Sequence, residues 1–263
     1  MASPFLIEKM DKYIKFLKRE WANWAFHKSA QLPLQEAQVS FTFDDAPHSA
    51  FELGGEILQR YGYAGTYYIA LTFLDDQLSE EASFSKKDLE VALDQGHELA
   101  CHTYKHIDLS KTNLLESIKD IKKNGELFQN LFPDNKLKNF SYPFGAETLA
   151  IKKFLGQEFR SARGIGHGLN IGKVDLANLK TIKLYRDRLS IEEVAQQIAT
   201  AKARRAWLIF YTHDVKQEPT PYGCTPDYFE AIVKMCADES LQVRTIDQTL
   251  DLIESLSLKS EHN

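Results

Sequence analysis

Strand-like and helix-like segments alternate through nearly the whole of this chain. Short runs rich in β-branched and aromatic residues are typical of strands, and the segments between them have the 3.6-residue spacing of amphipathic helices. No internal repeat and no low-complexity linker interrupts the alternation. The pattern predicts one α/β domain on a parallel sheet, either barrel-like or doubly wound. The expected strands lie at 39–43, 66–70, 97–101, 138–142, 159–162, 181–184, 207–212 and 241–245.

The size and composition of the chain agree with a folded domain. Its 263 residues suffice for one large α/β domain or two small ones, and 43% apolar with 26% charged residues argues against a disordered chain. A net charge of -5 gives no broad footprint for nucleic acid, so no nucleic-acid partner is expected. The three scattered cysteines contain no C-x-x-C pair and are too few for a disulfide framework.

The N-terminal region is expected to be a helical extension of the main domain. We assign residues 1–37 to a helix and a linker, and residues 38–263 to the main domain. The helix, over 5–26, has apolar side chains including two tryptophans on one face, with lysines between them. Such a basic amphipathic helix either makes a peripheral contact with an anionic membrane or packs on its own protein.

The compartment is judged from the same region. Charged residues stand where a signal peptide has its apolar core, and no apolar run approaches the roughly 18 residues of a membrane span. If Met1 is the natural start, the cytoplasm is therefore the expected location, with the inner face of a membrane as the place of any peripheral contact.

Polar groups follow several of the expected strands. The run Val39–Phe43 ends in Asp44 and Asp45, and His102 follows the strand at 97–101. A Ser-Tyr-Pro-Phe-Gly turn begins at 141, and His213 comes after the strand at 207–212. Because the carboxyl ends of parallel strands meet at one end of such a fold, these groups are expected to converge on one site.

The residue types suit metal-dependent hydrolysis. His102 and His106 are four residues apart, and two histidines with one carboxylate form a standard catalytic zinc set. One of Asp44 and Asp45 could bind the metal while the other acts as a base, and His213 offers an acid for the leaving amine. Loop histidines without a ligand role, and an Asp-rich turn, are the plainer alternatives.

Taken in order, these motifs resemble those of the polysaccharide deacetylases, which carry the NodB homology domain and form carbohydrate esterase family four. The resemblance rests on Thr-Phe-Asp-Asp at 42–45, His-Thr-x-x-His at 102–106, Phe-Ser-Tyr-Pro-Phe-Gly at 140–145 and Thr-His-Asp at 212–214, and it covers roughly residues 38 to 250. It implies an irregular (β/α) barrel related to the TIM barrel.

The resemblance also implies a role for individual residues. Asp44 would be the general base, and Asp45, His102 and His106 the metal ligands. Phe144 would give its backbone N–H to the oxyanion and His213 would be the general acid. The implied reaction removes an N-acetyl group from an amino sugar and releases acetate, with zinc, cobalt or nickel as the metal.

The sequence departs from the family pattern at one position that bears on catalysis. Ser141 stands where many members have an arginine that braces the catalytic aspartate. Three arginines are candidates to replace that guanidinium from another loop: Arg163, Arg186 and Arg188. Tyr142, Pro143 and Tyr222 are further candidates for supporting the site or contacting substrate.

The glycine-rich segment 164–170 is expected to be a loop at the rim of the site or a plain connection. It lacks the lysine and spacing of a phosphate-binding loop, so no nucleotide site is expected there.

Two other functions stay open at this point. One is hydrolysis of another non-peptide amide with the same metal core, because the missing arginine loosens the inference about the substrate. The other is an inactive member that only binds a glycan, which the joint presence of a base, a ligand set and an acid disfavours. In the cytoplasm, a nucleotide- or lipid-linked precursor is the expected form of the N-acetylated carbohydrate.

Overall fold

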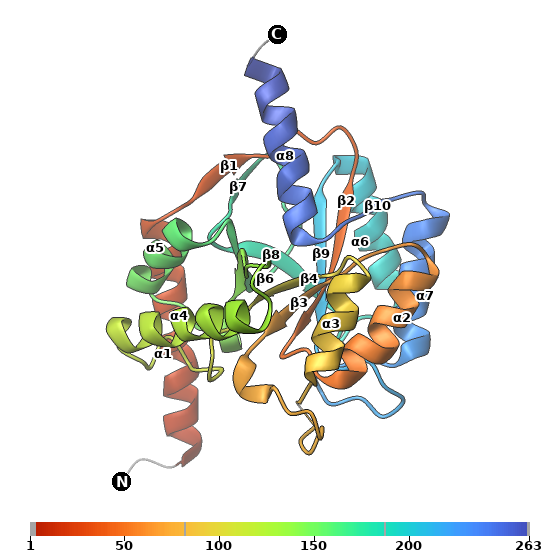
Figure 1. The fold of residues 1–263 in the computed structure, drawn as a ribbon. Helices are drawn as coiled ribbons and strands as arrows, with labels where there is room; N and C mark the ends of the chain where they lie inside the picture. Colours follow the sequence, from red (N-terminus) through yellow and green to blue (C-terminus); the bar gives the residue numbers. More distant parts are fainter. Residues whose placement is uncertain (1–3, 82, 187, 262–263) are drawn as a thin grey trace.

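The computed structural model describes residues 4–81, 83–186 and 188–261. Within them, seven parallel strands form a closed barrel (Figure 1), because β2 pairs with β3 on one side and with β9 on the other. This confirms the predicted (β/α) barrel. The strands follow around it in the order β2 (Gln38–Asp44), β3 (Thr66–Ile69), β4 (Glu98–Cys101), β5 (Asn139–Ser141), β6 (Ser161–His167), β8 (Leu179–Lys183) and β9 (Trp207–Thr212).

Three short strands lie outside the barrel. β10 (Gln242–Val243) adds to β2 in parallel, and β1 (Ser29–Gln31) pairs with β7 (Lys173–Asp175) in an antiparallel two-stranded sheet. β1 falls just before the linker expected at the end of the N-terminal extension.

Helices cover the outside of the barrel and begin where the sequence provides caps. Ser85 and Ser190 each form a capping box with the residue three positions later, which satisfies two backbone N–H groups at the helix start. The covering helices are a π-helical turn at Ala50–Gly55 continued by α2 (Glu56–Arg60), then α3 (Lys86–Asp94), α4 (Leu114–Leu131), α5 (Leu149–Glu158), α6 (Ile191–Arg204) and α7 (Pro226–Asp238).

One end of the barrel is closed by α8 (Ile246–Glu261), which lies over the amino ends of the strands (Figure 1). The backbone N–H of Ile246 donates to Thr66 Oγ1 at 3.0 Å, and that of Asp247 donates to Glu98 Oε2 at 2.9 Å. The helix start is thereby attached to the first residues of β3 and β4. The opposite end, where the strands finish, is the mouth of the barrel.

Strand alternation decides which side chains reach the mouth. On β2, Phe41 and Phe43 belong to the apolar core under the helices, where Phe41 stacks on Phe210. Thr42 and Asp44 therefore share the opposite face, toward the barrel interior. Asp44, the last residue of the strand, is thus directed into the barrel at its mouth.

The glycine-rich segment differs from the expectation. β6 begins at Ser161 and runs on through Gly164 and Gly166 to His167, so the expected loop is in part a barrel strand. A Cβ at Gly164 would stand 1.9 Å from Asn178 Oδ1, so only glycine allows that side chain to approach the strand.

The N-terminal helix α1 (Pro4–Ala25) packs beside α5 but leaves much of its apolar face exposed. None of the helices described is both long enough and apolar enough to cross a membrane. The exposed apolar residues of α1 are Met10, Tyr13, Ile14, Phe16, Leu17, Trp21 and Trp24.

Candidate active site

The mouth of the barrel brings together side chains from five strand ends. Asp44 and Asp45 come from the end of β2, and His102 follows β4 directly. Ser141 ends β5, and Arg163 lies on β6. His213 follows β9. The convergence expected from the sequence is therefore present.

Arg163 is the arginine that reaches Asp44. Its guanidinium, 1% exposed, forms an ion pair through Nη2 with Asp44 Oδ1 and also donates to Ser141 Oγ at 2.8 Å. Arg186 and Arg188, the other two candidates, form no ion pair with Asp44. Burial alone would raise the pKa of Asp44, but Arg163, with His102 and His213, lowers it to about 2. Asp44 is thus ionised at any physiological pH.

Ser141 explains how the arginine that pairs with Asp44 can come from β6 and not from β5. It is the direct partner of Arg163 in the β5–β6 pairing, so the two side chains leave the sheet side by side. The small serine leaves room for the guanidinium, and its hydroxyl lies 3.0 Å from Asp44 Oδ1. An arginine of the neighbouring strand thus reaches Asp44 past the position where many members of the resembled family have their own arginine.

A second buried cluster lies next to this pair. One ligand atom from each of Asp45, His102 and His106 lies within 4.8 Å of the others. Asp45 Oδ1 is 3.1 Å from His106 Nε2 and 3.5 Å from His102 Nε2. The Nδ1 of His102 lies 2.9 Å from the carbonyl oxygen of Ser141, which assigns the proton to Nδ1 and leaves Nε2 free as a ligand.

The cluster fits a divalent cation. Burial lowers the pKa of His102 to about 3 and also lowers that of His106, so both imidazoles are neutral. Asp45 Oδ1 is buried and has no hydrogen-bond partner among the residues that the structure describes. Lone pairs of three side chains therefore face one another, an arrangement that a cation stabilises. Burial raises the pKa of Asp45 to about 6 without such a cation, with Asp44 adding to the shift and His213 opposing it.

Two more predicted residues border the cluster. Phe144 adopts a left-handed backbone conformation (φ 58°), and its ring packs edge-on against His106 at 4.4 Å. It lies in the first turn of a short 3-10 helix, where backbone N–H groups lack intrahelical acceptors. His213 Nε2 is 3.7 Å from Asp45 Oδ2, and its buried Nδ1 has no hydrogen-bond partner among the described residues.

The remaining candidates divide between the rim and the core. Tyr222, 58% exposed, lies 5.5 Å from His213 ring to ring and belongs to the rim. The Tyr142 hydroxyl instead donates to the carbonyl of Ala177 at 2.9 Å, in a core cluster, so the structure does not bring it to the site. Pro143 begins the 3-10 turn that carries Phe144.

Two aromatic residues at the site were missed by reasoning from the sequence. Tyr68 and Tyr211 both lie against the Arg163 guanidinium, with ring centres 4.9 and 4.6 Å from its central carbon. Both rings favour the cation through their π faces. Side chains on a strand alternate between its two faces, so residues two positions apart share a face. Each tyrosine lies an even number of residues from an interior position of its strand, and this spacing could have placed it inside the barrel.

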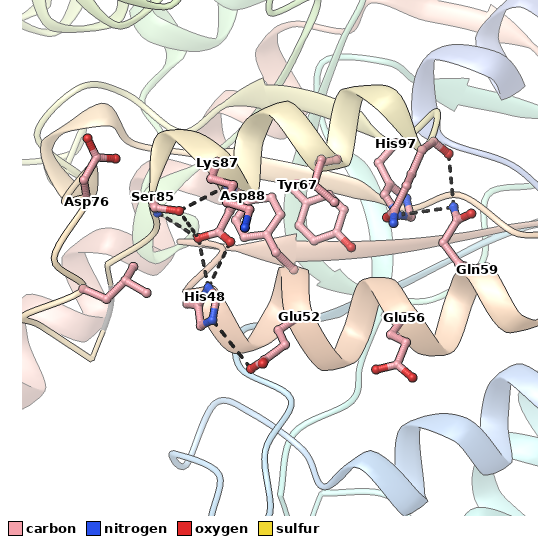
Figure 2. A pocket seen from close by; sticks show the side chains of 15 residues that line it. His48, Glu52, Glu56, Gln59, Tyr67, Asp76, Ser85, Lys87, Asp88 and His97 are labelled. Carbon is pink, nitrogen blue, oxygen red and sulfur yellow. Dashed lines mark hydrogen bonds and ion pairs between the residues drawn. The ribbon is translucent and has the colours of Figure 1, made fainter.

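A cavity of about 660 Å³ lies elsewhere, between the helical segment at 50–60 and α3 (Figure 2). Its polar side chains are largely paired with one another: His48 Nδ1 lies 3.0 Å from Asp88, and His97 Nδ1 accepts from the N–H of Gly65 at 2.9 Å. Burial lowers the pKa of His97 to about 4, so this imidazole is neutral. None of the predicted site residues lines this cavity, and the candidate site is the barrel mouth.

Comparisons of the sequence with known proteins find polysaccharide deacetylases. The family model described as Polysaccharide deacetylase matches residues 32–158. A chitin deacetylase from Arthroderma benhamiae is 26% identical over 120 residues, which are 45% of this chain and only 31% of that protein. This chain thus matches about a third of the length of that relative.

Solved structures share the fold. A family 4 acetyl xylan esterase from Clostridium thermocellum, in complex with a cobalt ion, has a TM-score of 0.57 at 18% identity, covering 82% of this chain and 91% of that one. A peptidoglycan deacetylase from Bacillus subtilis has a TM-score of 0.56 at 15% identity, covering 86% and 96%. The family model thus confirms the resemblance to the polysaccharide deacetylases over residues 32–158, and the solved structures share the fold over most of the chain.

Proposed function

We propose that this protein is a metal-dependent hydrolase that removes N-acetyl groups from an amino sugar of a polysaccharide or its precursor. The observation that carries the proposal is that Asp45, His102 and His106 lie close together beside an ionised Asp44. The acetyl xylan esterase of the same fold is in complex with a cobalt ion, which supports a metal site in proteins of this fold. Zinc is the metal we propose, because two histidines and one carboxylate suit it, and cobalt or nickel fits the same ligands.

The residues around the cluster divide the work of amide hydrolysis. When bound, a divalent cation acidifies a water molecule and polarises the acyl oxygen. Asp44 accepts the proton of that water, and Arg163 keeps Asp44 ionised and fixed in orientation. The water oxygen forms a bond to the acyl carbon as the carbon–nitrogen bond breaks.

Two further residues complete the proposed mechanism. The backbone N–H of Phe144 stabilises the negative charge that develops on the acyl oxygen. His213 donates a proton to the leaving amine, which gives the free amino sugar and acetate. The nitrogen we assign to this transfer is Nε2, which lies 3.7 Å from Asp45 Oδ2.

The test is acetate release after the enzyme has been stripped with a chelator and reloaded with zinc, cobalt or nickel. N-acetylated sugar oligomers and nucleotide-linked N-acetyl sugars are offered as substrates. We expect acetate only from the reloaded enzyme, and a loss of more than about 100-fold in His106→Gln. His48→Gln, which changes a partly exposed histidine of the other cavity, is the matched control and should keep full activity.

The same measurement separates the alternatives. Tight metal binding without acetate from any carbohydrate would favour hydrolysis of another non-peptide amide or an inactive, glycan-binding protein. Absence of bound metal would contradict the assignment of the cluster itself.

Peripheral membrane contact through α1 is a separate proposal. It is supported by the exposed apolar residues of α1, such as Trp21 and Trp24, on a helix that also carries Lys12 and Lys18. Liposome flotation of the full chain against a variant with Trp21→Ser and Trp24→Ser tests it. Equal recovery of both in the soluble fraction would remove the membrane contact, and with it the cytoplasmic membrane face as the proposed location.

A further inference from the structure

The loop that carries both proposed histidine ligands has a strained backbone. It joins β4 to α4 and runs from His102 to Asn113. Thr103 has φ 62° and His106 has φ 52°, so two residues with full side chains adopt the left-handed conformation that favours glycine. Such a backbone path persists only where the surroundings hold it, so the contacts of this loop decide where its histidines lie.

The two histidines differ in how they are held. The backbone N–H of His102 donates to the carbonyl of Ile69 at 3.0 Å, and its ring Nδ1 lies 2.9 Å from the carbonyl oxygen of Ser141. In the part of the chain that the structure describes, the imidazole of His106 has one polar contact, with Asp45, and its other neighbours are aromatic rings. The position of His106 therefore depends on the path of the loop.

One carboxylate of α4 holds the middle of this loop. Asp120 Oδ1 accepts hydrogen bonds from the backbone N–H of Tyr104 at 2.7 Å and from that of Lys105 at 3.1 Å. These two residues stand between Thr103 and His106, the two left-handed positions. Asp120 is partly buried, on a helix that packs beside β4. Hydrogen bonds to an ionised carboxylate are stronger than those between neutral groups, so this contact fixes the loop firmly.

The other hydrogen bonds of the loop do not duplicate this contact. The carbonyl of Tyr104 accepts from the N–H of Thr72 at 3.0 Å, and the N–H of Ile107 donates to Thr103 Oγ1 at 3.3 Å. Neither bond uses the two N–H groups that Asp120 binds. Removing this carboxylate therefore frees the segment directly before the second histidine.

We propose that Asp120 is a positioning residue of the metal site. By holding the loop between the two histidines, it sets where His106 stands relative to Asp45. Asp120 touches neither of these residues and belongs to none of the sequence motifs described above. The inference rests on the proposed function, because it requires a metal at these ligands. Groups that orient metal ligands typically change metal affinity or activity by about 10- to 100-fold when they are removed.

Zinc affinity, measured by competition with a chromophoric chelator, tests this role without any substrate. Asp120→Ala removes the acceptor while alanine favours the helix, and it should weaken zinc binding by about 10-fold or more. Asp120→Leu fills the space without an acceptor and should weaken zinc binding equally. Asp120→Asn keeps a carbonyl oxygen as acceptor and should stay within about 3-fold of the wild-type affinity.

Asp75 provides the matched control. It is also partly buried and accepts from two backbone N–H groups, those of Gln77 at 2.9 Å and Ser79 at 2.8 Å, in a loop that carries no proposed ligand. Asp75→Ala should lower the urea midpoint and leave zinc affinity unchanged. Loss of stability with unchanged zinc affinity in Asp120→Ala would show a merely structural role and overturn the inference.

A cycle with His106→Gln shows whether the effect passes through this ligand. In the His106→Gln protein, adding Asp120→Ala should change zinc affinity by less than about 2-fold, because the ligand that Asp120 positions is absent. A loss as large as that in the wild-type background would contradict the positioning of His106.

The same set of proteins separates this inference from the proposed function. Equal zinc affinity in the wild-type protein and Asp120→Ala, in an enzyme that releases acetate, would overturn the positioning role alone. Zinc affinity that depends on Asp120, without acetate from any substrate, would support the positioning role and refute the deacetylase. A wild-type protein that binds no zinc would overturn both.

Discussion

Both ends of the barrel hold carboxyl groups that are buried or partly buried, but the two ends satisfy them differently. At the closed end, Glu98 accepts hydrogen bonds from Thr66 Oγ1 at 2.9 Å, from Asn139 Nδ2 at 2.7 Å and from the N–H of Asp247 at 2.9 Å. At the mouth, Asp45 Oδ1 and His213 Nδ1 are buried, and neither has a hydrogen-bond partner in the part of the chain that the structure describes. Buried polar atoms in proteins are nearly always hydrogen-bonded, so unpaired ones indicate a site where a ligand can bind. The comparison indicates a structural role for the closed end and a ligand-binding role for the mouth.

The charges follow the same division. Burial raises the pKa of Glu98 to about 7 despite its donors, so the closed end favours a neutral carboxyl. At the mouth, Arg163 outweighs burial and lowers the pKa of Asp44 to about 2. At the mouth, the Arg163 guanidinium stabilises the charged form of Asp44, which the proposed reaction uses. At the closed end, the raised pKa favours the uncharged form of Glu98.

The largest expected effect comes from removing that guanidinium. Arg163→Met leaves Asp44 charged and unpaired in the interior, and breaking a buried pair in this way costs about 3–5 kcal/mol of unfolding free energy. Acetate release should fall by more than about 100-fold at unchanged zinc content. Arg163→Lys, which keeps the charge without the planar fork, should recover part of both losses. Urea unfolding and single-substrate kinetics measure them, and full activity in Arg163→Met would sink the bracing role.

The closed end predicts a pH effect on stability. Because the folded-state pKa of Glu98 is raised from 4.5 to about 7, folded Glu98 keeps its proton while the unfolded chain loses it as pH rises through this window. Stability from Glu98 is therefore fully present below pH 4.5 and falls by up to about 3 kcal/mol as pH rises past 7. Glu98→Gln should abolish this contribution. Urea midpoints that change in parallel in the wild-type protein and Glu98→Gln from pH 4.5 to pH 8 would contradict this prediction.

Metal binding should stabilise the folded protein through ligands at the mouth, and this gain should not depend on the closed end. Zinc at 100 times its Kd should raise the free energy of unfolding of the wild-type protein by about 2.7 kcal/mol. Asp45→Asn removes one of the three proposed ligands and should lose most of this gain, whereas Glu98→Gln should keep it. Thermal unfolding with and without zinc measures the difference, and equal gains in all three proteins would place the metal elsewhere.

The smallest expected effect concerns Tyr142, which the sequence had suggested as a supporting residue of the site. Its hydroxyl donates to Ala177 in the core, so Tyr142→Phe should cost about 1 kcal/mol of stability and leave kcat within 2-fold. Chemical denaturation and acetate release test the two parts. A large loss of kcat would return Tyr142 to the active site.

Much of this architecture could be predicted from local sequence signals. Strand runs that end in Asp44 and Asp45 or in His102, and helices with Ser85 and Ser190 caps, are visible as short patterns and predict the alternation and the mouth. The order of the motifs then predicts the resemblance to the polysaccharide deacetylases, which the family model confirms over residues 32–158. The roles of the individual residues stay predictions.

What escaped prediction depends on pairing between strands. Three arginines were equally good candidates in the sequence, and only the register that sets Ser141 opposite Arg163 distinguishes them. The aromatic pair around Arg163 likewise joins residues from β3 and β9, which are far apart in the chain. The core hydrogen bond of Tyr142 was likewise not predictable, because a residue's neighbours in the sequence do not reveal which way its hydroxyl points.

The most direct measurement compares one carboxylate from each end of the barrel. Asp44→Asn and Glu98→Gln are both isosteric replacements of buried carboxyls, and both would be assayed for acetate release after zinc loading, with metal content checked. We expect Asp44→Asn to lose about 10³-fold in kcat at full zinc content, and Glu98→Gln to retain wild-type kcat at a pH where it is folded. Wild-type activity in Asp44→Asn, or equal losses in both variants, would contradict the assignment of catalysis to the mouth.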